Sequence, residues 1–273
     1  MAFTVLSWNI EHFKDNTNRT KRVADRIKIH NPDIFAILET ESLKTLEMMQ
    51  NHFPTYNFHI TDGKQTQEIM VGVRNNVFSQ VAFTQKREFD NGNPFLRPGA
   101  QLTLKKGNDL YVLLFLHNDS GTDASAFGNR FEMIDRVKNM AKRINKIDPN
   151  GKVIIAGDLN TMGMYFPSQR KNDNRVTMEE EIIGVTKLMN QYNFNWATKQ
   201  HEETWLSKPG SFTSNLDHVI HSQGVQLKPL GNRTSDGNPF QVKVEGWVGL
   251  TKTLQQKYLD ELSDHCMLFW EVM

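Results

Sequence analysis

The sequence predicts an α+β fold in which two mixed β-sheets stack face to face between flanking helices. Short apolar runs typical of strands alternate with segments of helical periodicity, and several strands follow one another directly through the middle of the chain. A doubly wound sheet would place a helix between most consecutive strands, so stacked sheets fit this order better. No repeat or Gly/Ser/Pro-rich linker divides the chain, and we expect one domain over residues 1–273.

Two uninterrupted apolar runs, residues 112–116 and 153–156, are typical of strands that are buried on both faces. Other runs with strand character cover residues 3–8, 34–38, 69–73 and 266–270.

Apolar residues recur at helical spacing over residues 131–144 and 182–192, and more weakly over 23–27. Pro32, directly after Asn31, ends the helix indicated by residues 23–27, because the residue before a proline is pushed out of the helical conformation.

The composition is that of a globular protein with balanced charge. There are 32 Lys and Arg against 31 Asp and Glu, and this balance neither requires nor excludes a polyanionic partner. No window approaches the roughly 18 apolar residues of a membrane span, and no signal-peptide pattern is visible, so we expect a cytoplasmic protein. The single cysteine, Cys266, excludes an internal disulfide and a cysteine zinc cluster. We expect a monomer without an obligate protein partner.

Amide, carboxylate and imidazole side chains stand at one end of six predicted strands. If the late strands run antiparallel to the earlier ones, all six ends meet at one edge, where ligands of open α/β sheets gather. The residues are Asn9, Glu39, His117, Asp158 with Asn160, Asp217, and Asp264 with His265.

Each of these residues has a structural explanation when it is taken alone. Asn9 suits a turn, Glu39 suits a solvated helix N-terminus, and His117 suits a packed histidine. Six such coincidences would all have to fall at strand ends, so we favour a shared site. The set contains no Ser or Cys nucleophile beside a base, and it suits hard-cation binding and phosphate chemistry.

Five motifs together resemble the endonuclease/exonuclease/phosphatase superfamily, the fold of exonuclease III and deoxyribonuclease I. The resemblance implies a four-layer αββα sandwich with the active site at one end of the two sheets. It also implies hydrolysis of a phosphate ester with Mg²⁺, for which Mn²⁺ may substitute. The motifs are Ser7-Trp-Asn-Ile-Glu11, Leu38-Glu39, Gly157-Asp-Leu-Asn160, Leu216-Asp-His-Val219 and Ser263-Asp-His265.

The chain departs from the family pattern at identifiable places. Leu38 stands before Glu39, where the family often has Gln. The stretch Asn215-Leu-Asp-His218 differs from the Trp-Cys-Asp-Arg signature of inositol polyphosphate phosphatases, and from the Arg-Ile-Asp of abasic-site endonucleases. Abasic-site endonucleases also carry a Tyr where this chain has His117. The segment from His117 to Thr122 is similar to that of less characterised bacterial members.

As a hypothesis on the metal, we assign Glu39 and Asp264 as carboxylate ligands of Mg²⁺ and Asn9 as an amide oxygen ligand. Because Mg²⁺ keeps several of its waters, two acids are enough.

The remaining residues receive catalytic roles in the same hypothesis. Asp158 orients and helps to deprotonate the attacking water, and Asn160 donates to a phosphate oxygen. His265, oriented by Asp217, contacts the phosphate or serves as acid or base. His117 holds a second phosphate oxygen or protonates the leaving group.

Basic residues in loops near the predicted site are the candidates for substrate binding. In one loop, Tyr165 and Phe166 interleave with three of them, a combination that suits a nucleic-acid backbone and stacked bases, although a solvated loop fits equally well. The candidates are Arg97, Arg170, Lys171 and Arg175.

Three functions follow, and the sequence favours the first. It is a nuclease that cleaves DNA or RNA. The second is a phosphoesterase for a small molecule or a lipid head group, similar to a sphingomyelinase, which the near-neutral charge keeps open. The third is a non-catalytic binding module, which we disfavour because all six positions retain competent side chains.

Overall fold

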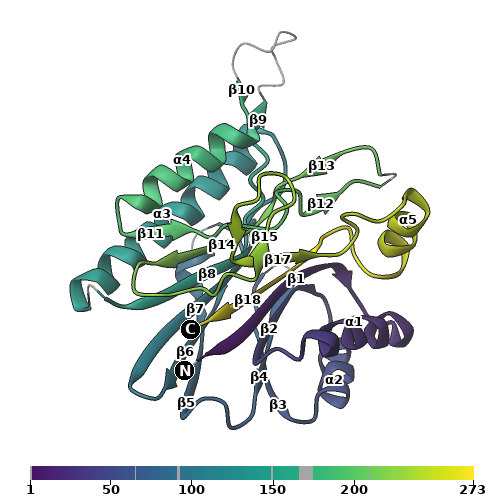
Figure 1. The fold of residues 1–273 in the computed structure, drawn as a ribbon, viewed down its shortest axis with the longest axis horizontal. Coiled ribbons are helices and arrows are strands. Elements are labelled where there is room, and N and C mark those ends of the chain that lie inside the picture. Colours follow the sequence, from purple (N-terminus) through teal and green to yellow (C-terminus); the bar gives the residue numbers. More distant parts are fainter. Residues whose placement is uncertain (1, 65, 91–92, 149, 166–174, 209) are drawn as a thin grey trace.

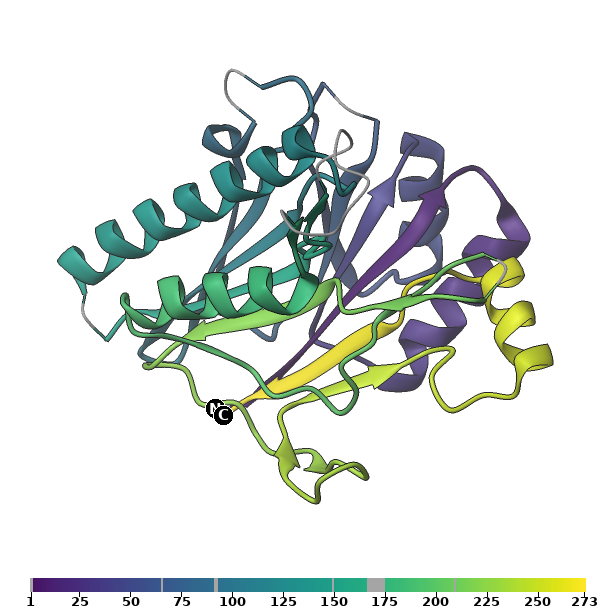
Figure 2. The ribbon, with the colours of Figure 1, turned by 90° about the horizontal axis from the view of Figure 1, so that it is seen from above.

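The computed structural model describes residues 2–64, 66–90, 93–148, 150–165, 175–208 and 210–273. Two six-stranded mixed sheets lie face to face between helices, which confirms the predicted sandwich (Figure 1). Seen from above, the helices fall into two groups on opposite sides of the sheets (Figure 2). The first group is α3 (Ala124–Ile147) and α4 (Met178–Asn190), and the second is α1 (Thr17–His30), α2 (Leu43–His52) and α5 (Lys252–Glu261).

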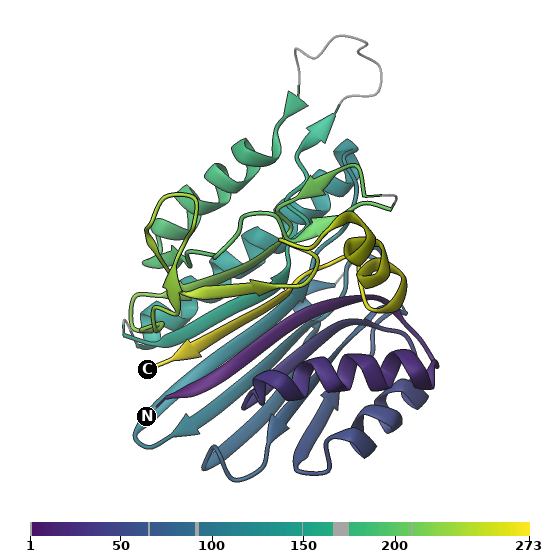
Figure 3. The same ribbon diagram turned by 45° about the vertical axis from the view of Figure 1, so that its right-hand side comes forward.

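The first sheet holds both ends of the chain, which lie side by side (Figure 3). In this sheet β1 and β2 pair in parallel, and the other neighbours pair antiparallel. In spatial order the strands are β17 (Val242–Glu245), β18 (Met267–Val272), β1 (Phe3–Phe13), β2 (Ile34–Thr40), β4 (Glu68–Arg74) and β3 (Tyr56–Ile60).

The second sheet has the same plan, with β7 and β8 as its parallel pair. The crossover between these two strands contains α3, just as α1 lies in the crossover between β1 and β2. In spatial order the strands are β11 (Phe194–Trp196), β14 (Asp217–Ser222), β8 (Lys152–Asp158), β7 (Asp109–His117), β6 (Gly99–Lys106) and β5 (Gln80–Lys86).

Short elements make up the rest of the described regular structure. A single 3-10 turn, η1, covers Arg87–Phe89. Three two-stranded hairpins extend from the sandwich: β9 (Met164–Tyr165) with β10 (Arg175–Val176), β12 (Trp205–Leu206) with β13 (Thr213–Ser214), and β15 (Gly231–Asn232) with β16 (Pro239–Phe240).

The central strands of the second sheet separate two hydrophobic cores. In β7, Leu113 and Phe115 belong to the core between the sheets, whereas Leu114 and Leu116 belong to the core beneath α3 and α4. Strand β8 alternates in the same way. This confirms that the apolar runs 112–116 and 153–156 are buried on both faces.

Helix α1 begins and ends at residues that the sequence makes recognisable. The Asn16 side chain accepts the N–H of Arg19 at 3.0 Å and caps the first turn. At the other end Asn31 takes a left-handed φ of 45°, and its N–H donates to the carbonyls of Ile27 and Lys28. Pro32 follows directly, as predicted. In the described part of the chain, no helix combines the length and the hydropathy needed to cross a bilayer.

Most elements run further than their apolar patterns predicted. Strand β1 extends beyond the predicted residues 3–8 to Phe13, and α3 extends beyond 131–144 at both ends. The prediction misses β5 entirely, because most of its side chains are exposed and leave no apolar pattern. Strands at the edge of a sheet are the hardest to recognise for this reason.

The close pairing of β7 and β8 requires glycine at position 157. Gly157 has a φ of 134°, and an added Cβ would lie 2.1 Å from the carbonyl oxygen of Leu116. We expect Gly157→Ala to lower the free energy of unfolding by about 3 kcal/mol or more, from overpacking and backbone strain. Gly128, in the middle of α3, has nothing within 4 Å of an added Cβ, and Gly128→Ala should stabilise by roughly 0.5–1 kcal/mol. Urea unfolding of both variants checks this, and equal stabilities would contradict it.

Candidate active site

Six strand ends from both sheets meet at one edge of the sandwich. The parallel pairs β1–β2 and β7–β8 bring their carboxyl ends there. Strand β14 runs antiparallel to β8 and β18 runs antiparallel to β1, so the late strands begin where the earlier ones finish, as the sequence hypothesis required. In register, Asp217 lies directly opposite Asp158.

A cleft of about 250 Å³ opens at this edge, and most of the predicted site residues line it. Asn9 and Asp217 lie just beneath its wall and hydrogen-bond to lining residues. We call this hollow the rim cleft. The predicted residues that line it are Glu39, Arg97, His117, Asp158, Asn160, Asp264 and His265.

Backbone strain is concentrated around the rim cleft. Of the seven non-glycine residues with positive φ in the described chain, four line it: Glu11, His12, Glu39 and Asn160. A positive φ is rare for Glu, and such strain persists only where the surroundings impose it. Here the register of β2 shifts near Glu39 in its pairing with β1 and also in its pairing with β4. This irregularity directs the Glu39 carboxylate into the cleft.

Asn9 connects the two sheets at the centre of the site. Its amide nitrogen donates to Glu39 Oε1 and to Asp158 Oδ2, each at 3.0 Å. Its amide oxygen, the predicted metal ligand, accepts the N–H of Glu11 at 3.0 Å. The contacts are those of a side chain that holds two carboxylates in place.

Glu39 receives an amide contact that its own motif lacks. Leu38 stands where the family often has Gln, but Gln67, from the chain that enters β4, donates through Nε2 to Glu39 Oε2 at 2.8 Å. The N–H of His12 donates to the same oxygen at 2.9 Å. Gln67 in turn accepts a hydrogen bond from Arg97 Nη2, so the guanidinium and the carboxylate are linked through one amide.

Asp264 leaves one carboxylate oxygen without a hydrogen bond. Oδ2 accepts the indole N–H of Trp205 at 2.8 Å, while Oδ1 is buried, has no hydrogen bond and lies 3.9 Å from His265 Nε2. Burial also raises the pKa of Asp264 above its ordinary value. A buried carboxylate oxygen without a hydrogen bond, in a cleft shared with Glu39, is suited to a hard divalent cation, so the donor set fits Mg²⁺.

His265 and Asp217 form a buried charged pair. His265 Nδ1 donates to Asp217 Oδ2 at 2.8 Å, and Nε2 lies 3.7 Å from Asp158 Oδ2. Burial alone would lower the pKa of His265, but the carboxylates of Asp217 and Asp158 outweigh it and raise the pKa to about 10. The ring is therefore an imidazolium at neutral pH.

The second histidine of the site has the opposite character. Burial, with the positive charges of Arg97 and His265 nearby, holds the pKa of His117 well below its usual range. The neutral ring places Nε2 3.6 Å from Glu39 Oε1 and 3.7 Å from Asp158 Oδ2, and its Nδ1 is buried without a partner. One imidazole is thus charged and the other neutral at neutral pH.

Asp158 lies between all these groups. Burial raises the pKa of its carboxyl, and Asp217 and Glu39 raise it further against the opposing effects of His265 and Asn9. Its Oδ1 accepts the N–H of Asn160 at 3.0 Å. The Asn160 side chain, predicted to contact phosphate, donates to the carbonyl of Asn118 at 3.0 Å and has a second amide hydrogen available.

Asp158, Asp217 and His265 also form a buried group that is able to bind a metal, because their ligand atoms lie within 4.8 Å of one another. A protonated imidazole has no lone pair to donate, so in that state the group is a charge-paired cluster instead.

The predicted substrate-binding residues fall in different places. Arg97 lines the rim cleft, and its Nε is buried without a partner, while burial lowers the pKa of the guanidinium. Arg175 is exposed on β10 and does not line the cleft. Arg170 and Lys171 lie outside the described residues.

Several residues that support the site escaped the sequence analysis. Gln67 could have been found by applying the strand-end argument to β4, which runs antiparallel to β2. Arg19 donates to the carbonyls of Ile10, Glu11 and His12 and so holds the strained end of β1. No pattern in the sequence marks Arg19, because its partners are backbone atoms.

Lys199 is a further residue of this kind. Its ammonium is buried and donates to the carbonyls of Glu202, at 3.1 Å, and Asp217, at 2.8 Å, and to Asn215 Oδ1. Burial lowers the pKa of Lys199 to about 8. Thr204 Oγ1 accepts the N–H of Asp217 at 3.0 Å, so the peptide groups on both sides of this residue are held.

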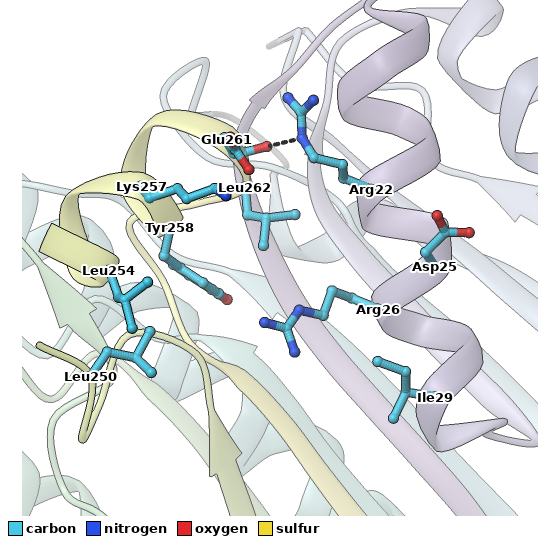
Figure 4. A pocket seen from close by; sticks show the side chains of 10 residues that line it. All are labelled: Arg22, Asp25, Arg26, Ile29, Leu250, Leu254, Lys257, Tyr258, Glu261 and Leu262. Atoms are coloured by element: carbon cyan, nitrogen blue, oxygen red, sulfur yellow. Dashed lines mark hydrogen bonds between the residues drawn. The ribbon is translucent and has the colours of Figure 1, made fainter.

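A larger hollow of about 490 Å³ lies between α1 and α5 and holds none of the predicted site residues. Figure 4 shows Arg22 and Arg26 of α1 facing Leu254 and Tyr258 of α5, with Arg22 bonded to the carbonyl of Glu261. Its lining mixes cationic with aliphatic side chains and contains no histidine. Size alone therefore does not identify the functional site.

Solved structures of low sequence identity share the whole fold. Truncated TDP2 from Caenorhabditis elegans is 17% identical, with a TM-score of 0.68 over 100% of this chain and 98% of its own. D. rerio TDP2, complexed with a single-strand DNA product, is 14% identical, with a TM-score of 0.67 over 100% and 99%. An endonuclease/exonuclease/phosphatase from Bacteroides vulgatus is 12% identical, with a TM-score of 0.67 over 100% and 99%. At these identities the likeness shows the fold alone.

The sequence itself carries the family relationship. A search of curated proteins finds no match. Residues 6–265, however, match the Endonuclease/Exonuclease/phosphatase family, a range that includes all the lining residues of the rim cleft. The activities that name this family all hydrolyse phosphate esters, and its members generally depend on a divalent metal. This chain is therefore a member of the endonuclease/exonuclease/phosphatase family.

Proposed function

We propose that the protein is a Mg²⁺-dependent phosphodiesterase that cleaves DNA or RNA. The observation that carries the proposal is the rim cleft, in which Glu39, Asp158 and Asp264 face His117 and His265. Carboxylates opposite imidazoles combine a cation site with proton donors, which is what hydrolysis of an anionic ester requires. Ser120 lines the same cleft, but among the described residues no hydrogen bond joins a Ser or Cys side chain to these carboxylates or imidazoles, so water is the nucleophile in this proposal.

Glu39 and Asp264 would hold the metal. The Oδ1 of Asp264, which accepts no hydrogen bond, supports this assignment, as does the second carboxylate in the same cleft. When bound, a divalent ion polarises the phosphoryl oxygen and stabilises the leaving oxyanion. Asn9, through its two hydrogen bonds, keeps Glu39 and Asp158 apart and oriented.

Asp158 would accept a proton from the attacking water, while His265 and His117 would donate to phosphate oxygens. Asp217 fixes the ring of His265 through Nδ1, which leaves Nε2 directed toward Asp158. Arg97 supplies a guanidinium with a free Nε at the cleft wall, where it can bind a further phosphate oxygen.

Lys199 acts indirectly, as a positioning residue for Asp217. Its ammonium donates to the Asp217 carbonyl, while the Asp217 carboxylate accepts a hydrogen bond from His265. The ammonium thus fixes the residue that orients the imidazole.

The catalytic assignment predicts large losses of turnover. Asp158→Ala and His265→Ala should each reduce kcat on a phosphodiester by at least ~10²-fold, the scale of a lost acid–base or electrostatic group. EDTA should abolish activity, and Mg²⁺ or Mn²⁺ should restore it. Asp260→Asn, on the exposed side of α5, serves as the matched control and should keep full activity. Normal turnover in either folded cleft variant would exclude its assigned role.

The positioning of Asp217 by Lys199 predicts a loss of both stability and turnover. Lys199→Met leaves two buried acceptors, Asn215 Oδ1 and the Asp217 carbonyl, without this donor and should lower the free energy of unfolding by about 2 kcal/mol, with a lower kcat. Lys228→Met removes an exposed pair with Glu271 and should change stability by at most about 1 kcal/mol. Urea unfolding and steady-state kinetics test both variants. Unchanged kcat in Lys199→Met would show that the lysine has a structural role only.

Salt dependence separates a nuclease from an enzyme for small phosphate esters. For single-stranded DNA, duplex DNA or RNA, kcat/KM should fall at least about tenfold between 50 and 200 mM salt, because several phosphate contacts are screened. A sphingomyelin analogue and sugar phosphates should be poor substrates in the same panel. Fast turnover of either, with a mild salt response, would favour the small-molecule alternative.

A further inference from the structure

Three exposed aromatic side chains belong to segments that also contribute lining residues to the rim cleft. Among the large hydrophobic residues that the structure describes as exposed, four are aromatic: Phe95 at 62%, Phe131 at 61%, Tyr165 at 49% and Phe212 at 71%. Leaving such rings in water forgoes the free energy of burying them, so their exposure calls for an explanation. Phe131 lies in the groove between α3 and α4. The other three are the ones on segments that reach the rim cleft.

Each of these three segments is tied to a lining residue of the cleft. Phe95 lies two positions before Arg97, and Tyr165 lies three after Met162. Phe212 closes the β12–β13 hairpin by donating its N–H to Ser207 Oγ at 2.9 Å. Ser207 lies two positions after Trp205, which lines the cleft. The β9–β10 and β12–β13 hairpins lie at the end of the molecule away from the termini (Figures 1 and 3).

The backbone of the two hairpins that carry Tyr165 and Phe212 is held by contacts with the rest of the fold. The N–H of Tyr165 donates to the carbonyl of Thr122 at 2.7 Å, and Tyr165 pairs directly with Arg175 across the hairpin. The β12–β13 hairpin is fastened to the end of β1 by the ion pair of Lys208 with Glu11, at 2.7 Å.

The size of the cleft places most of a polymeric substrate outside it. About 250 Å³ is below the usual 300–1,000 Å³ of a small-molecule pocket, so it accommodates a phosphate and its immediate surroundings. Nucleotides on either side of the scissile bond must then lie on the surrounding surface, to which the segments of Phe95, Tyr165 and Phe212 belong through their lining residues.

We propose that Phe95, Tyr165 and Phe212 are stacking platforms for unpaired bases of the substrate. This rests on the proposed function and narrows the substrate to a strand whose bases are accessible. Aromatic faces bind unpaired bases of any sequence, while cations beside them follow the phosphates. Arg175 opposite Tyr165 and Arg97 near Phe95 provide such cations.

The arrangement is less suited to a membrane surface. Insertion into lipid needs a contiguous apolar patch, whereas these rings stand singly on three separate segments. The residues around Phe212 are polar, with Ser207, Lys208, Ser211 and Thr213 in the same hairpin. Stacking of separate bases uses single rings, and membrane insertion does not.

The experiment compares two oligomers that differ only in their bases. Fluorescence anisotropy in EDTA measures binding of a labelled oligothymidylate and of an abasic oligomer with the same number of phosphates. Phe95→Ala, Tyr165→Ala and Phe212→Ala should each weaken binding of the oligothymidylate about tenfold, the effect of one lost stacked base. Binding of the abasic oligomer should not change. Phe212→Trp should retain the affinity, and Phe131→Ala is the control that should behave as wild type.

Several outcomes would overturn the stacking proposal. The first is unchanged affinity for the oligothymidylate in all three alanine variants. The second is an equal loss of affinity for the abasic oligomer in these variants. The third is that the variants lose binding to vesicles of phosphatidylcholine and sphingomyelin and keep their affinity for the oligothymidylate. Turnover of bis(p-nitrophenyl) phosphate with Mg²⁺ or Mn²⁺ tests the catalytic proposal separately. Wild-type protein that binds the oligothymidylate but hydrolyses neither it nor bis(p-nitrophenyl) phosphate would refute the phosphodiesterase function and leave the stacking result standing.

Discussion

The side-chain amide of Asn9 is the interaction on which the site depends. It rises from the first sheet and binds Glu39 of its own sheet and Asp158 of the other, so that one group sets the spacing of carboxylates from two layers. Two carboxylates brought together in a buried place repel each other, and a bridging donor reduces this repulsion. The strained backbone around Glu11 and Glu39 is the local consequence of aiming both strands at the same point.

Burial gives the charges of the cleft their different roles. The carboxylates of Asp217 and Asp158 keep His265 protonated, whereas burial, with Arg97 and His265 nearby, keeps His117 neutral. Two further contacts complete this arrangement: Lys199 donates to the carbonyl of Asp217, and Trp205 donates to one oxygen of Asp264. The other oxygen of Asp264 has no hydrogen bond, which is why the proposed metal position falls there and not between Asp158 and Asp217.

The strands and site residues that could be predicted from the sequence were those with a local sequence pattern. Uninterrupted apolar runs identified β7 and β8, and their ends led to His117 and Asp158, since a strand end is visible in the sequence. Strand β5 escaped because its exposed side chains leave no period to detect. Gln67 was missed because the strand-end argument was not applied to β4, and Arg19 because its contacts are with backbone carbonyls. The hydrogen bonds from the Asn9 amide to Glu39 and Asp158 likewise have no local signature in the sequence.

By itself, the sequence determined the layered α+β architecture, the family, and the set of acids, amides and imidazoles that a common edge would collect. These follow from periodicity and from motif spacing, which are local properties. Only the tertiary structure decided the directions of β14 and β18, the separate protonation of the two histidines, and the exposure of rings near the cleft. These features depend on distances between side chains, and on burial, in segments that lie far apart in the sequence. No local pattern encodes such distances.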